Sequence, residues 1–120
     1  MDRPESITID EHGNVIVIRL IGEHDVSTVA ELRAKLETLP PSTGVVVSLA
    51  ETTFFDSSVI HTLIGTGEKL RERNQPLVIH VPVPSLGQRI LQALQPEAPI
   101  PLTPSLDEAL ALARSASHMD

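Results

Sequence analysis

The sequence predicts a single α/β domain in which helices cover a mixed sheet of four to five strands. Short β-branched runs alternate with segments whose apolar residues recur at helical spacing, the order typical of parallel strands with crossover helices. The 120 residues suffice for one domain with one core, expected over about 7–113, with flexible ends at 1–6 and 115–120. Hydrophobic residues make up 41% of the chain while Trp and Tyr are absent, so that core must be aliphatic.

The first two elements are predicted to form a β-hairpin. Residues 7–9 alternate apolar and polar side chains, residues 12–14 (His-Gly-Asn) carry turn chemistry, and residues 15–21 are almost continuously aliphatic. Because apolar residues occupy both faces of this second run, it is expected to be a central strand covered on two sides. The Gly-Glu-His-Asp sequence at 22–25 is predicted to end it.

A helix over 28–39 is predicted to follow, because Thr28 and Glu31 have capping-box spacing and apolar residues recur at helical intervals. Two prolines, Pro40 and Pro41, end this helix. The β-branched run 45–49 then has the composition of a buried, parallel strand.

The second half of the chain continues the alternation. A helix is predicted over 57–73, a buried strand over 77–81 and a third helix with an apolar stripe of Leu86, Ile90 and Leu94. Prolines then leave space for a vestigial strand at 100–102. A closing helix follows Ser105, which has capping-box spacing to Glu108.

Charge and composition exclude several functional classes. Nine basic residues stand against 16 acidic ones, for a net charge of −7, and no run of Lys or Arg occurs, which argues against direct binding to nucleic acid. Cysteine is absent and the five histidines show no metal spacing, so we expect neither a metal nor a cofactor. The N-terminus lacks the apolar core of a signal peptide, and no apolar run approaches the ~18 residues of a membrane span. These features favour a cytoplasmic protein whose partners are proteins.

The stretch Phe54–His61 holds the most specific chemistry. The only two aromatic residues lead into Asp56 and two hydroxyls, Ser57 and Ser58. Asp56 is predicted to be the N-cap of the helix, and the free amides and dipole at that end favour negative charge, so a phosphate would fit there. The alternative is an ordinary helix start, since all classes of protein cap helices with these residue types.

One face of this helix is predicted to be a contact surface. Ser58, His61, Thr62 and Gly65 form a patch of small, nearly uncharged residues, although Gly in a helix costs about 1 kcal/mol relative to Ala. The alternative is an ordinary wet surface in which Gly65 is a tolerated defect.

The sequence also allows a hydrolase to be considered, because Ser57 and His61 are one helical turn apart and Asp25 could lie near them. We do not favour it, since the sequence has no Gly-x-Ser-x-Gly elbow and a Ser–His pair in a first helical turn is common by chance. We therefore expect no enzyme. Asp25 is either a residue that only orders the start of the first helix or a functional neighbour of Ser57.

Three motifs resemble the STAS domain, the family of bacterial anti-sigma-factor antagonists, and the resemblance extends from about Ile7 to Ala113. Residues 22–25 are similar to the family's Gly-x-x-Asp, residues 45–58 to its apolar strand followed by Asp-Ser-Ser, and residues 103–110 to its closing capped helix. The resemblance implies a single STAS-like domain over 1–120.

The resemblance also implies partner switching. Such an antagonist binds an anti-sigma factor that is also a serine kinase, phosphorylation ends the binding, and a serine phosphatase restores it. The residue that is phosphorylated in the family corresponds to Ser57. The aspartate of the family's Gly-x-x-Asp motif corresponds to Asp25. The family usually has Gly where this chain has Val59, and Asp where it has Ser48.

We therefore expect regulation of transcription by a phosphoprotein, with an adaptor subunit of a larger cytoplasmic or transporter-associated complex as the alternative. The residues expected to bind the partner are Asp25, Asp56, Ser57, Ser58, His61, Thr62 and Gly65.

Overall fold

The computed structural model describes residues 6–40, 43–82 and 100–117. In chain order, the elements are β1 (Ser6–His12), β2 (Val15–His24), α1 (Val26–Glu37), β3 (Gly44–Ser48), β4 (Thr52–Phe55), α2 (Ser57–Glu72), β5 (Leu77–His80), β6 (Leu102–Thr103) and α4 (Leu106–Ser117). The predicted third helix, with its stripe of Leu86, Ile90 and Leu94, lies outside the described residues. None of the helices in the described ranges is long and apolar enough to cross a membrane.

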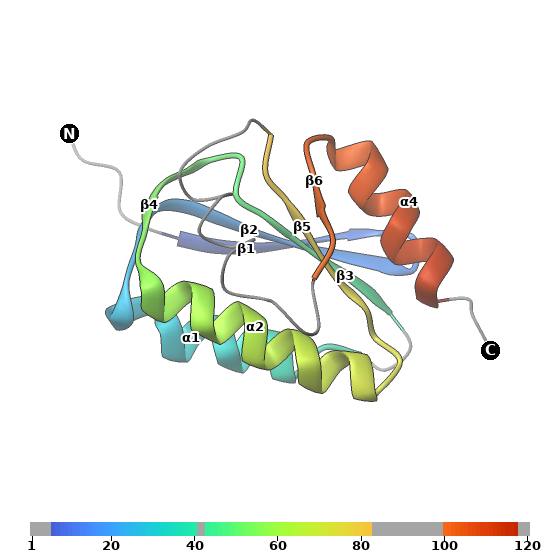
Figure 1. Ribbon diagram of the computed structural model, residues 1–120, viewed down its shortest axis with the longest axis horizontal. Coiled ribbons are helices and arrows are strands. Elements are labelled where there is room, and N and C mark those ends of the chain that lie inside the picture. The colour runs from blue at the N-terminus through green and yellow to red at the C-terminus, as the bar shows by residue number, and fades with distance from the viewer. Residues whose placement is uncertain (1–5, 41–42, 83–99, 118–120) are drawn as a thin grey trace.

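The strands form one mixed sheet, as predicted, but with six strands (Figure 1). The order is β1-β2-β3-β5-β6, with β4 paired to β2; the β1–β2 pair is antiparallel and the others are parallel. The hairpin turns at Gly13, whose φ of 67° is accessible to glycine without strain, and at Asn14.

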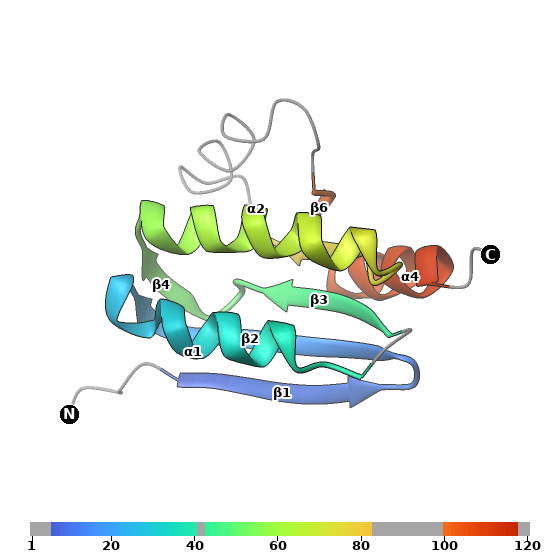
Figure 2. The ribbon, with the colours of Figure 1, turned by 90° about the horizontal axis from the view of Figure 1, so that it is seen from below.

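Helices cover both faces of the sheet. Helices α1 and α2 pack side by side on one face and α4 packs on the other (Figure 2). Strand β2 supplies Ile16, Ile18 and Leu20 to the larger core cluster under α1 and α2, and Val15 and Val17 to the smaller cluster under α4. The prediction of a central strand covered on two sides is therefore confirmed.

Close packing fixes the position of α4. A Cβ atom added at Gly44, the first residue of β3, would lie 2.5 Å from the carbonyl oxygen of Ala113 in α4. The helix backbone therefore approaches the sheet at a point where no side chain fits. This contact anchors the C-terminal half of α4 to the amino end of β3.

Several element boundaries differ from the prediction, most by one or two residues, and the larger differences have structural causes. Strand β2 continues to His24, because its last residues pair with β4, a strand that was not predicted. Helix α1 begins at Val26, because its N-cap is Asp25 and the predicted capping box at Thr28 is wrong. Helix α1 also ends at Glu37, before the predicted end, and α4 continues to Ser117, beyond the predicted start of the frayed tail.

Candidate functional site

The candidate site lies at one end of the molecule, where two neighbouring strands run into two helices. Strands β2 and β4 pair in parallel through Glu23–Phe54 and His24–Phe55, and each strand is followed by one capping residue and a helix. Helices α1 and α2 consequently begin at the same edge of the sheet (Figure 1). Two helix N-termini, each with a carboxylate cap, thus meet at the carboxyl ends of the strands.

The capping carboxylate of α2 distinguishes the two neighbouring serines. Oδ1 of Asp56 accepts hydrogen bonds from the amide of Ser58 at 3.0 Å, the amide of Val59 at 3.3 Å and the hydroxyl of Ser58 at 2.5 Å. Ser58 is half-buried, whereas Ser57 is exposed and its hydroxyl makes no hydrogen bond within the described part of the chain. The structure therefore leaves Ser57 as the accessible hydroxyl of the pair.

Val59 is accommodated without disturbing this helix start. Its side chain is fully buried and belongs to the larger core cluster. Helix α2 nevertheless begins at Ser57 with the predicted N-cap, Asp56. The β-branched residue thus anchors the first turn of α2 to the core.

The capping carboxylate of α1, Asp25, accepts hydrogen bonds in the same way as Asp56 does at the start of α2. Oδ1 of Asp25 accepts from the amide of Ser27 at 2.9 Å and from its hydroxyl at 2.6 Å. Donation by this hydroxyl, followed by that of the amide, lowers the pKa of Asp25 below its usual range. The exposed end of the two helices therefore carries at least one firmly ionised carboxylate.

His24 orders the connection into α1, a role that the sequence did not reveal. The side chain is buried, Nε2 donates to the carbonyl of Ile21 at 3.0 Å, and Nδ1 lies 3.2 Å from the hydroxyl of Thr28. These contacts bind the end of β2 to the first turn of α1. A histidine directly before an N-cap was the available signal, but its partners could not be inferred locally.

The predicted contact face of α2 is only partly exposed. His61 and Gly65 are exposed, but Thr62 is 6% exposed and donates a hydrogen bond to the carbonyl of Ser58 at 2.8 Å. The expectation that Thr62 belongs to a fully exposed face is wrong, because this flank of α2 turns toward α1 and lines a groove between the two helices. Helical periodicity alone did not show on which flank the neighbouring helix would pack.

No catalytic triad is assembled from the three residues considered for hydrolysis. Within the described ranges, no hydrogen bond joins Ser57 to His61 or His61 to Asp25, and the Asp25 carboxylate is engaged with Ser27. The geometry offers an exposed hydroxyl at a helix N-terminus without the base and orienting group of a nucleophilic site.

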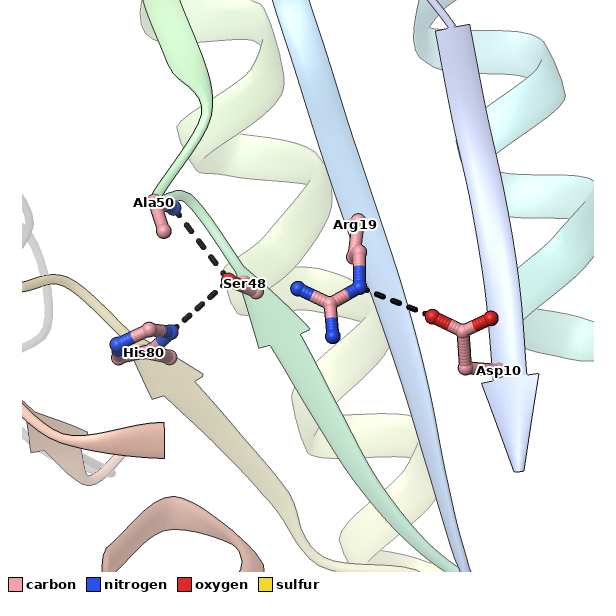
Figure 3. Close-up of polar contacts among 5 residues, drawn as sticks. All are labelled: Asp10, Arg19, Ser48, Ala50 and His80. Carbon is pink, nitrogen blue, oxygen red and sulfur yellow. Dashed lines mark hydrogen bonds and ion pairs between the residues drawn. The ribbon is translucent and has the colours of Figure 1, made fainter. Parts of the chain in front are cut away.

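A second polar cluster lies on the α4 face of the sheet (Figure 3). Arg19, Ser48 and His80 stand side by side on β2, β3 and β5, and Nε of Arg19 donates to Asp10 on β1 at 2.9 Å. The hydroxyl of Ser48 lies 2.9 Å from Nδ1 of His80, and the amide of Ala50 donates to the same hydroxyl at 3.4 Å. These contacts join β1 to β2, and they join β3 to β5 and to the turn before β4.

The same cluster disfavours the charged form of His80. Burial lowers the pKa of His80, a hydrogen bond to the carbonyl of Pro104 partly raises it, and the charge of Arg19 lowers it further. In the sequence, Ser48 stands out only as a departure from the family pattern. Ser48 and His80 are polar residues near the ends of two buried strands, and this shared position was the signal that could have predicted their contact.

Comparison with known proteins identifies the fold family. A family model described as "Mlab, STAS domain" matches residues 7–100. The chain belongs to the STAS domain family. A search of curated proteins gave no match.

Several solved structures are similar to most of the chain. An anti-sigma factor antagonist from Mycobacterium paratuberculosis is 26% identical, with a TM-score of 0.76 over 92% of this chain and 95% of that one. The phosphorylated form of the Bacillus cell fate determinant SpoIIAA is 23% identical, with a TM-score of 0.69 over 91% of this chain and 100% of that one. A sulfate transporter family protein from Wolinella succinogenes is 17% identical, with a TM-score of 0.68 over 88% and 89%.

Proposed function

We propose that this STAS protein is a cytoplasmic anti-sigma factor antagonist that binds an anti-sigma factor with serine-kinase activity and loses that binding when Ser57 is phosphorylated. The observation that carries the proposal is the contrast between the two hydroxyls: Ser57 is exposed and Ser58 is hydrogen-bonded to Asp56. Membership of the STAS family and the similarity to an anti-sigma factor antagonist support the class of partner.

The helix N-terminus supplies the physical basis for accepting a phosphate. A phosphate on Ser57 adds about −1.5 to −2 charges, which the free amides and dipole of α2 stabilise. The phosphorylated protein is therefore expected to keep its fold. Any change in partner affinity would then arise at the interface and not from unfolding.

The neighbouring carboxylates explain why the phosphate would end binding. Asp56 and Asp25 already place negative charge at the edge where α1 and α2 begin, in a protein with a net charge of −7. A docked partner must desolvate the added dianion, and like charges brought together across an interface cost several kcal/mol. A reversible switch follows, with a serine phosphatase restoring the binding-competent form.

A second candidate is an adaptor subunit of a larger complex in which Ser57 is only the first residue of the helix. Its supporting observation is that two buried positions, Ser48 and Val59, depart from the usual family pattern next to the motif. The hydroxyl of Ser48 bonds to His80, where the family's usual Asp would place a charge.

Phosphosite mapping after incubation with the co-purifying kinase and ATP tests the proposal, with Ser57→Ala and Ser58→Ala as matched variants. The proposal expects phosphate on the wild type and on Ser58→Ala, and none on Ser57→Ala. Phosphate on Ser58 alone, or retention of the partner by Ser57→Asp, would favour the adaptor function.

A further inference from the structure

A groove runs between α1 and α2, beginning one helical turn beyond Ser57. Its volume is about 320 Å³, and its lining residues are Arg33, His61, Thr62, Gly65, Thr66 and Lys69. The two helices lie side by side along their length (Figure 2). The hydrogen bond from Thr62 to the carbonyl of Ser58 connects the lining of the groove to the helix start.

The lining is basic although the protein is acidic. Arg33, His61 and Lys69 contribute basic side chains, and among the described residues no carboxylate belongs to the lining, whereas the whole chain has a net charge of −7. Nζ of Lys69 lies 3.6 Å from Glu37, but both side chains are well exposed. Exposed ion pairs of this kind contribute little, so the Lys69 ammonium can exchange this partner for another carboxylate.

The spacing of these groups indicates an elongated ligand. His61 and Lys69 are eight residues apart on α2, which corresponds to about 12 Å along the helix axis. Arg33 stands on the opposite wall, on α1. One small anion cannot contact both ends of this row, whereas successive carboxylates of an acidic chain can.

Gly65 marks a place where a ligand can approach the helix backbone. A Cβ atom at Gly65 would meet no heavy atom of the described residues within 4 Å, so packing among them does not require glycine there. At Gly67, by contrast, an added Cβ would lie 2.8 Å from Cδ1 of Ile100, so core packing accounts for that glycine. Gly65 costs helix stability without a packing reason among the described residues, and it leaves the groove open at its middle.

We propose that the α1–α2 groove binds an acidic segment of the protein partner, with carboxylates at Arg33, His61 and Lys69 and close backbone approach at Gly65. The inference rests on the proposed function for the nature of that partner. It also explains how phosphorylation would weaken binding, because a phosphate on Ser57 would lie at one end of the groove and repel the acidic segment. Arg33 and Lys69 are thereby added to the expected contact residues.

The test is a titration of the full ¹⁵N-labelled protein with a capped, helical Glu–Ala peptide, followed by amide chemical shifts. The expected shifts map to Arg33 and to the segment from His61 to Lys69, and a capped Lys–Ala peptide produces none. Arg33→Glu and Lys69→Glu should each weaken binding by about tenfold, as expected for reversed charges at a contact. Arg71→Glu, an equal change of charge at an exposed position of α2 outside this lining, should leave the affinity within about twofold.

Several outcomes would overturn the inference. These are the absence of shifts, equal shifts with the Lys–Ala peptide, and equal weakening by Arg71→Glu, which would mean that net charge alone matters. Inorganic phosphate shifting the same amides at the same concentration would indicate a general anion site and contradict an elongated acidic ligand.

The peptide test does not depend on the kinase, so it can succeed even if Ser57 is never phosphorylated. Conversely, a kinase that phosphorylates Ser57 but binds Arg33→Glu and Lys69→Glu as tightly as the wild type would uphold the proposed function and refute the groove.

Discussion

Replacing glycine by alanine at positions 65 and 67 of α2 should change the free energy of unfolding by clearly different amounts. Both positions are inside the same helix, so both substitutions gain the same helix propensity, about 1 kcal/mol. The difference in the free energy of unfolding between the two variants then depends only on the atoms that each new methyl group contacts. The comparison therefore tests the packing of α2 without assuming a propensity scale.

The two methyl groups meet different surroundings. At position 65 no heavy atom in the described part of the chain lies within 4 Å of the new methyl group, so Gly65→Ala should stabilise the fold by about 0.5–1 kcal/mol. At position 67 the methyl would lie 2.8 Å from Ile100 Cδ1 and 3.1 Å from Leu77 Cδ2, and both neighbours are buried. Overpacking of this kind costs about 1–3 kcal/mol, which offsets or exceeds the gain in propensity.

Urea unfolding followed by circular dichroism measures the difference, since the chain has no Trp or Tyr for fluorescence. With a slope of about 1–3 kcal/mol per molar urea, a difference of about 2 kcal/mol separates the two midpoints by about 1 M. Equal midpoints would refute the described packing of α2 against Leu77 and Ile100. A less stable Gly65→Ala would show that position 65 is not open, and would remove the structural basis for close approach at the groove.

Three further predictions concern the helix cap, the position of α4 and the buried histidine. Asp56→Ala removes the acceptor of three hydrogen bonds and should lower the free energy of unfolding by about 1–2 kcal/mol, with Asp56→Ser restoring most of it; unchanged urea midpoints would contradict the cap. Gly44→Ala places a methyl against the backbone of Ala113 and should cost about 2–3 kcal/mol or more, together with faster amide exchange in α4; native-like exchange would contradict the contact. Burial lowers the pKa of His80 in the folded protein below 6.5, so near that pH the folded protein binds fewer protons at His80 than the unfolded chain does. The contribution of a less protonated His80 to the free energy of unfolding is therefore fully present above pH 6.5, and it is lost as the pH falls through the lowered pKa of the folded state. In urea unfolding at a series of pH values, His80→Gln should make the free energy of unfolding depend less on pH in this range, and a curve parallel to that of the wild type would contradict a lowered pKa of His80.

Features set by local chemistry could be predicted from the sequence. The hairpin follows from Gly13 between two β-rich runs, and the start of α2 follows from Asp56 before an amphipathic segment. The N-cap of the last helix was also predicted correctly, because the amide of Glu108 donates to the hydroxyl of Ser105. Each of these signals lies within a few residues of the feature that it specifies.

Features that depend on distant partners could not be predicted in this way. Strand β4 forms because the end of β2 is available beside it, and its polar residues Thr52 and Thr53 gave no strand pattern of their own. The choice between Asp25 and Thr28 as cap of α1 is set by where β2 ends, since both residue types cap helices well.

The candidate site shows the same division between local and distant information. The roles of Asp56 and the accessibility of Ser57 follow from a local motif. The pairing of Ser48 with His80 joins residues 32 positions apart, and the burial of Thr62 depends on how α1 packs against α2. Sequence periodicity gives the faces of one helix but not the neighbour that covers each face.

The most direct test of the proposed switch is the dissociation constant for the anti-sigma factor before and after phosphorylation by its kinase, with the phosphosite mapped on the same sample. We predict a single phosphate on Ser57 and an affinity at least about a hundredfold weaker, as several kcal/mol of like-charge repulsion require. Phosphate at another residue, or an unchanged dissociation constant with Ser57 fully phosphorylated, would contradict the account.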